Sequence, residues 1–210
     1  GKGIGASIDE NDGFAGVPYE VFIFPGILTM TVLFQSVFYG LYIVWDRKID
    51  FLKEVLAAPL NRSTVFLGKC LGGVTDSMIQ VTIIIVLGFF IFPDIEYTLQ
   101  SIMLVYLYLF LLAVIMTSLG LIIGSRMDSP EGFSLITSLV VFPMYFLSGA
   151  LFLKKSLIDE APIIYWLTVI NPASYAVDAI RYTMIPEDIF LEFGLALSLI
   201  HISEPTRQEA

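Results

Sequence analysis

The sequence has few charged residues, and it contains long stretches with none. Only 15% of its 210 residues are charged and 57% are hydrophobic, whereas about 25% charged residues is usual for a soluble domain. The apolar residues fall into runs of about 20 residues, the length that an α-helix needs to cross ~30 Å of hydrocarbon. The sequence therefore predicts an all-α integral membrane protein, a polytopic bundle of transmembrane helices.

Cysteine, histidine and the common catalytic motifs are also scarce. Cys70 is the single cysteine and His201 the single histidine, which excludes an internal disulfide and makes a zinc site unexpected. No G-x-x-x-x-G-K-[ST], H-E-x-x-H or G-x-S-x-G pattern occurs, so we expect no ATPase site, no catalytic or metal-binding residue and no cofactor of its own. A net charge of −9 argues against nucleic acid as a partner.

Four apolar runs are long enough to be complete spans, and a fifth begins near Ile189 but is cut short. Polar turns that contain Pro or Gly separate the second run from the third and the third from the fourth. The predicted spans are Glu20–Trp45, Val65–Phe92, Leu99–Gly124 and Phe133–Leu153.

The segment Asp46–Ser63 interrupts this apolar pattern with six charges in nine residues. Holding them at the bilayer centre would cost on the order of 15 kcal/mol, so we place the segment outside the membrane. Five Lys or Arg residues lie between Arg47 and Lys69, whereas the turn between the second and third spans has none. The positive-inside rule then predicts that Asp46–Ser63 is cytoplasmic and that the other turn faces outward.

Within this segment an apolar stripe follows helical spacing, and it consists of Phe51, Leu52, Val55 and Leu56. Charged side chains occupy the other side, namely Asp50, Lys53 and Glu54. Pro59 disfavours helix at Ala58 and should end the helix there. Two to three turns are too short to be stable alone, so we expect the helix to dock on something. The pattern leaves open whether it merely joins two spans or binds a cytoplasmic partner.

Three stretches resemble type-2 ABC exporter permeases, the family that includes drug-resistance and nodulation exporters. "DFLKEVLAAPLNRSTVFLGKCLGG" resembles the loop between the family's second and third helices. "FPMYFLSGALF" resembles part of its fifth helix, and "INPASYAVDAIRYTM" resembles the signature before its last helix. Together, and in the family's order, these stretches cover most of Phe24–Met184.

The resemblance implies six helices per subunit, a second permease subunit, and a separate ATP-binding cassette subunit on the cytoplasmic face that binds ATP and Mg²⁺. It implies a multi-pass protein of the cytoplasmic (inner) membrane of a prokaryote, exporting a drug, lipid, glycolipid or polyketide-like substrate. Phe51–Ala58 then corresponds to the coupling helix, and the implied coupling residues are Asp50, Phe51, Leu52, Lys53, Glu54, Val55, Leu56 and Arg62. An ion-coupled secondary transporter or a non-transporting membrane assembly subunit is the alternative.

Other residues are candidates for the translocation path or for packing. Asp76 and Gln80 share a polar face of the second span and either line a path or fix helix packing. The short segments around residues 162–184 suit re-entrant or interfacial helices better than spans. By resemblance they form an extracytoplasmic gate, and the alternative is a structural plug; the candidate residues are Asn171, Pro172, Tyr175, Asp178 and Arg181. Two small-xxx-small pairs allow close helix approach, Gly68 with Gly72 and Gly120 with Gly124.

The expected organisation has three parts. Residues 1–19 form an extracytoplasmic lead. Residues 20–196 form the transmembrane permease domain, with a cytoplasmic coupling loop at 46–64 and an extracytoplasmic re-entrant region at 154–188. Residues 197–210 form a non-native tail, because "LSLIHISEPTR" resembles the translation of an adapter used in sequencing libraries.

Overall fold

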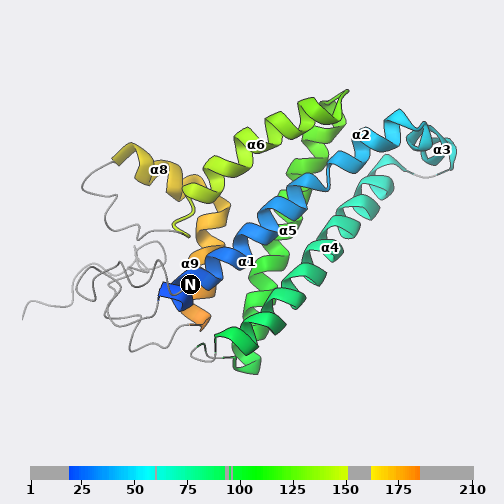
Figure 1. The fold of residues 1–210 in the computed structure, drawn as a ribbon. Helices are drawn as coiled ribbons and strands as arrows, with labels where there is room; N and C mark the ends of the chain where they lie inside the picture. The colour runs from blue at the N-terminus through cyan, green and yellow to red at the C-terminus, as the bar shows by residue number, and fades with distance from the viewer. Residues whose placement is uncertain (1–18, 60, 93–94, 96, 151–161, 185–210) are drawn as a thin grey trace, which may run out of the picture.

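The computed structural model describes residues 19–59, 61–92, 95, 97–150 and 162–184. All the regular structure within these ranges is helical, which confirms the predicted all-α fold. Figure 1 shows an elongated bundle in which α1 and α2 run between α6 on one side and α4 on the other. The helices are α1 (Tyr19–Phe38), α2 (Leu41–Lys48), α3 (Phe51–Ala57), α4 (Arg62–Ile91), α5 (Leu99–Arg126), α6 (Pro130–Phe146), α8 (Pro162–Ile170) and α9 (Pro172–Met184).

Three helical stretches are long and apolar enough to cross a membrane, which confirms a polytopic membrane protein. They are Val21–Lys48, Arg62–Ile91 and Leu99–Arg126, with 28, 30 and 28 residues. The fourth predicted span, Phe133–Leu153, is replaced by α6, which has only 17 residues and rises about 26 Å.

Local backbone chemistry explains the bounds of α6. The helix begins early because the Ser129 hydroxyl accepts a hydrogen bond from the Gly132 amide and Pro130 occupies the first helical position. It ends at Phe146, and it cannot resume directly afterwards because Gly149 adopts a left-handed conformation, with φ of 75°. The rest of the predicted fourth span (151–153) and the run from Ile189 lie outside the described residues.

The first span is the central helix of the bundle. α1 lies against α4, α5, α6 and α9, and its side chains Phe22, Phe24, Leu28, Val32 and Leu33 are almost completely buried. The outer faces of α4 and α5 expose many large apolar side chains instead. Such faces suit contact with lipid, because lipid tails are as apolar as these side chains and there is no hydrophobic drive to bury them against another helix.

The first predicted span, Glu20–Trp45, is confirmed by the apolar helical stretch Val21–Lys48, but it is not one uninterrupted helix. The helix is interrupted at Tyr39–Gly40, between α1 and α2. The backbone of Gly40 packs directly on Gly120 and Gly124 of α5, and a Cβ atom on Gly120 would collide with the carbonyl oxygen of Val37. Glycines thus let the first span cross α5 with the two backbones in contact.

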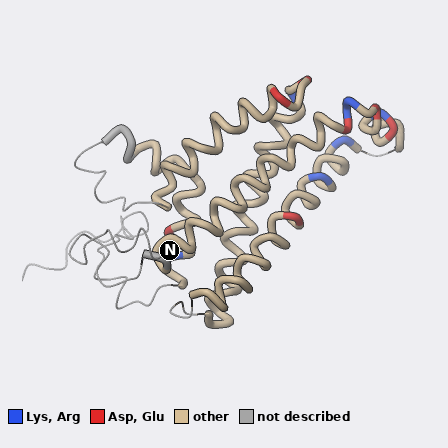
Figure 2. Tube along the Cα trace, viewed as in Figure 1, with Lys and Arg blue, Asp and Glu red and all other residues tan. Residues whose placement is uncertain are grey.

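Charged residues gather at one end of the bundle. Figure 2 shows them where α2, α3, the start of α4 and the turn between α5 and α6 meet, at the end far from α8 and α9. The turn between α4 and α5 lies at the opposite end. The structure therefore places the predicted coupling loop and the α5–α6 turn on the same side.

Candidate functional site

The segment α3 projects from the charged end because the backbone turns sharply on both sides of it. Asp50 precedes α3 with a φ of 61°, a left-handed conformation that Asp tolerates better than most residues. Ala58 follows it in an extended conformation, with φ of −67° and ψ of 150°, as a residue before proline should. The two turns separate a seven-residue helix from α2 and α4.

The apolar stripe of α3 is largely exposed. No residue of this helix, all of which is described, is buried in the chain. Phe51 and Leu56 are each 47% exposed, and the neighbouring Ile49 is 68% exposed. Leu52 and Val55 are partly buried. Docking on the rest of this chain therefore covers only part of the stripe.

The charged side of α3 is also open to solvent. The Lys53 ammonium pairs with the Asp50 carboxylate at 2.7 Å, and both side chains are mostly exposed. Glu54 and Arg62, the latter at the start of α4, are exposed as well. An exposed pair of this kind contributes little to stability, so these four charges are available to another surface.

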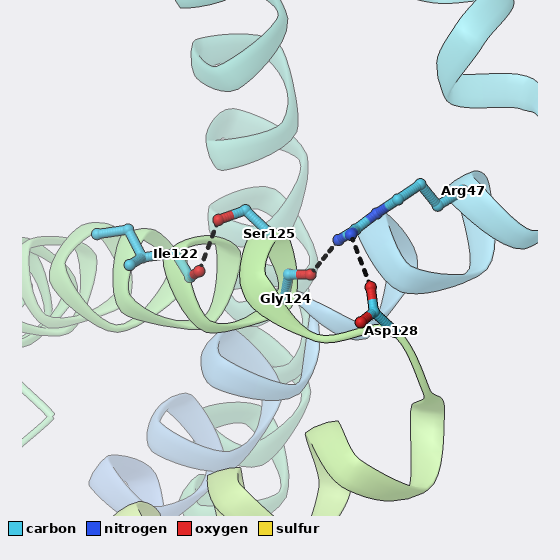
Figure 3. A network of polar contacts seen from close by, with 5 residues as sticks. All are labelled: Arg47, Ile122, Gly124, Ser125 and Asp128. Carbon is cyan, nitrogen blue, oxygen red and sulfur yellow. Dashed lines mark hydrogen bonds and ion pairs between the residues drawn. The ribbon is translucent and has the colours of Figure 1, made fainter.

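Three residues outside the predicted coupling set, Asp46, Arg47 and Lys69, tie the base of this segment to the bundle. Asp46 in α2 pairs with Lys69 in α4, and both side chains are largely buried. Arg47 donates a hydrogen bond from Nη2 to the carbonyl oxygen of Gly124, at 2.6 Å, and its Nη1 lies 3.7 Å from Asp128 (Figure 3). Sequence spacing could not predict these contacts, because Asp46 and Lys69 are 23 residues apart and Arg47 and Gly124 are 77 residues apart.

The four candidate residues of α4 are in different surroundings. Asp76 and Gln80 are partly buried. A Cβ atom on Gly72 would collide with the Tyr39 hydroxyl at the α1–α2 break, whereas Gly68, on an exposed stretch, has no atom within 4 Å of such a position. Gly72 and its neighbour Gly73 thus make room for the Tyr39 ring, and Gly68 makes no close contact within the described chain.

Asn171 and Pro172 start α9 and join it to α6. The Asn171 side-chain oxygen accepts a hydrogen bond from the Ala173 amide at 3.0 Å, as an N-cap does. Its Nδ2 donates to the carbonyl oxygen of Met144 at 2.5 Å, a group left over at the end of α6. Pro172 is the first residue of the helix. The exposed Tyr175 donates its hydroxyl proton to the carbonyl oxygen of Val169 at 2.7 Å.

Arg181 is the most buried charged residue among those described, with 1% exposure. It donates hydrogen bonds to the carbonyl oxygens of Gly149, Ala150 and Phe22, at 2.8, 2.9 and 3.4 Å. Its guanidinium also lies 3.8 Å from the centre of the Phe22 ring. These contacts join α9 to the segment that follows α6 and to α1.

The described part of the chain contains no group of three or more His, Cys, Asp or Glu side chains that could hold a metal ion. Residues 5–185 match the family model described as "ABC-2 type transporter". The chain belongs to this family. The match covers α1 to α9, and therefore both the exposed α3 and the Arg181 site.

Several transport permeases of this kind are similar to the chain. It is 30% identical over 168 residues to "Putative transport permease ycf38" of Cyanophora paradoxa, covering 78% of this chain and 56% of that protein. It is 28% identical over 188 residues to "Inner membrane transport permease YadH" of Escherichia coli K12, covering 87% and 68%. It is 24% identical over 196 residues to "Nodulation protein J" of Rhizobium leguminosarum bv. viciae, covering 90% and 70%.

The chain thus spans between 56% and 70% of the length of these three relatives. No solved structure matches it.

Proposed function

We propose that the chain is the membrane-spanning permease subunit of an ATP-driven exporter and that α3 is the element contacted by a separate ATP-binding cassette subunit. That subunit would bind ATP and Mg²⁺, and this chain would supply the transmembrane path. The observation that carries the proposal is the exposure of the apolar side chains of α3 at the charged end of the bundle.

Two physical arguments support a partner at α3. A helix of seven residues is too short to be stable by itself, and this one gains little from its own chain because none of its residues is buried. Apolar side chains next to a charged, water-facing turn are also the usual mark of a protein-binding surface. The exposed Asp50, Lys53, Glu54 and Arg62 fit the polar rim of such a contact.

Family membership supports the rest of the proposal. It favours pairing with a second permease subunit and a place in the cytoplasmic (inner) membrane of a prokaryote, with α3 on the cytoplasmic side; one relative is named as an inner membrane transport permease. The cargo class is a drug, lipid, glycolipid or polyketide-like molecule. Movement of α3 would shift α2 and α4, and the α8–α9 segment with Asn171 and Arg181 would close the outer end.

The proposal is tested by damaging the α3 surface in the full-length protein. Phe51→Ala combined with Glu54→Lys should weaken co-purification with the ATPase subunit and abolish the change in ATP hydrolysis that the permease causes. Leu99→Ala is the control, because Leu99 is 74% exposed and is the first residue of α5, whose start lies at the opposite end of the bundle from α3. Unchanged binding and hydrolysis in the α3 variant would show that α3 is not the contact.

A further inference from the structure

The segment that carries α3 is fastened to the bundle at its base by two adjacent residues of α2. Asp46 pairs with Lys69, so the chain leaves the bundle at one member of the pair, forms α3 and returns at the other. The side chains of Asp46 and Lys69 are only 16% and 20% exposed. The pair is thus shielded from solvent and is screened less by salt than a surface pair.

Arg47 makes the second connection, to α5 and to the turn that leads into α6. Its guanidinium approaches the C-terminus of α5, where the last carbonyl groups have no partner within the helix and the helix dipole favours a cation. It donates to the Gly124 carbonyl at 2.6 Å and lies 3.7 Å from Asp128, as Figure 3 shows. The Ser125 hydroxyl donates to another carbonyl near the end of α5, that of Ile122, at 2.7 Å.

These connections differ in strength in a way that suits movement. The bond to Gly124 is charge-assisted and short, whereas Asp128 is 99% exposed and its pairing with Arg47 is long. Arg47 can therefore exchange the carboxylate for water while it keeps the carbonyl. The α1–α2 break at Tyr39–Gly40 lies less than three turns before Arg47, where the backbone crosses α5 on glycines.

We infer that Asp46, Arg47 and Lys69, here called the α2 clamp, are positioning residues that pass movement of α3 into α4 and α5. The inference rests on the proposed function, because it assumes that an ATPase subunit moves α3. The α2 clamp contributes no surface to the partner in this scheme. Loss of the α2 clamp should leave binding of the ATPase subunit intact, but movement of α3 should no longer reach the opposite end of the bundle. That end, here called the far end, contains the start of α5 and α8.

The experiment measures distances between spin labels in the full-length protein bound to its ATPase subunit, with Cys70→Ser as the common background. One label pair reports α3 relative to the far end, at Ala57→Cys and Leu99→Cys. The second reports the far end alone, at Leu99→Cys and Ile170→Cys; Leu99 and Ile170 are 74% and 77% exposed. Each pair is measured without nucleotide and with ATP and vanadate.

In the otherwise unchanged protein, ATP and vanadate should shift both distances. In Arg47→Ala or Lys69→Ala, the α3 distance should still shift, and the population with a shifted far-end distance should fall roughly tenfold, as expected for loss of a charge-assisted hydrogen bond. Arg126→Ala is the matched control, because Arg126 is an exposed cation at the end of α5 and belongs neither to the α2 clamp nor to α3; both shifts should remain.

Exchange of the charges in Asp46→Lys with Lys69→Asp should restore the far-end shift if the pair acts as a link. A normal far-end shift in both single variants would overturn the inference and leave the proposed function intact. If the single variants do not assemble, the exchanged pair decides: failure to restore both assembly and the far-end shift overturns the inference. Absence of any shift in the unchanged complex would instead contradict the proposed function.

Discussion

Arg47 and Arg181 lie at opposite ends of the bundle, and both donate hydrogen bonds to backbone carbonyl groups. The acceptor of Arg47 is in the last turn of α5, and those of Arg181 are in the segment after α6 and the first turn of α1. Arg181 is 1% exposed, donates hydrogen bonds to three carbonyl groups and lies over an aromatic ring. The side chain of Arg47 is 36% exposed, donates a hydrogen bond to one carbonyl group and pairs with an exposed carboxylate. The same guanidinium group therefore holds α9 firmly to its neighbours at one end of the bundle. At the other end it holds α2 to α5 through contacts that solvent can partly replace.

The difference follows from solvation. A buried guanidinium is tolerated only when its donors are paired, so the junction at Arg181 is costly to open. A partly exposed guanidinium can trade a protein partner for water at little cost. If an ATPase subunit moves α3, as proposed, the first arrangement suits an element that holds its shape and the second suits an element that moves.

The largest effect should come from Arg181→Ala. Removing the guanidinium leaves the carbonyl groups of Gly149, Ala150 and Phe22 without these donors, and we expect the free energy of unfolding to fall by about 3–5 kcal/mol. Denaturant titration in detergent micelles measures it. The free energy of unfolding of Arg181→Lys should lie between those of the unchanged protein and Arg181→Ala, because one ammonium cannot reproduce the planar, forked donors of the guanidinium. A loss below about 1 kcal/mol for Arg181→Ala would remove the contrast between the two ends.

A smaller effect is expected where α1 and α2 cross α5, between the two ends. Gly120→Ala places a Cβ atom against the backbone of Val37, which cannot move aside as a side chain can, and should cost about 1–3 kcal/mol. The matched control is Gly68→Ala, which meets open space and should gain about 0.5–1 kcal/mol from its helix propensity. Equal effects in the same titration would contradict the close crossing.

The smallest effect should come from the exposed pair beside α3. Lys53→Ala should change the free energy of unfolding by less than about 0.5 kcal/mol, because both partners are mostly exposed. The titration used for Arg181 measures it. A large loss of stability would mean that the α3 segment is fixed to the bundle as firmly as α9, and the comparison between the two ends would fail.

Much of the fold could be predicted from residue patterns. Hydrophobic run length identified the positions of the spans, and Pro59 marked the end of α3 because proline restricts the residue before it. Run length overestimated α6, since the helix ends at Phe146 inside an apolar stretch and the left-handed Gly149 prevents it from continuing. The break at Tyr39–Gly40 was missed for a related reason: both flanks are apolar, and the cause is the contact with Gly120 on another helix.

The candidate site was only partly predictable. Periodicity shows which face of α3 is apolar, but it does not show that the face is left uncovered. The contacts of Arg47 with Gly124 and of Arg181 with Gly149 go to backbone oxygens 77 and 32 residues away. Backbone acceptors carry no sequence signal, so only a three-dimensional arrangement identifies them.

The central claim, that α3 is the contact for an ATPase subunit, is tested most directly by photo-cross-linking. A photoreactive amino acid replaces Phe51 in the full-length protein, co-expressed with its ATPase subunit, and replaces Leu99 at the opposite end as the control. The account predicts a covalent product with the ATPase subunit from position 51 and none from position 99. A product from position 99, or none from position 51, would contradict it.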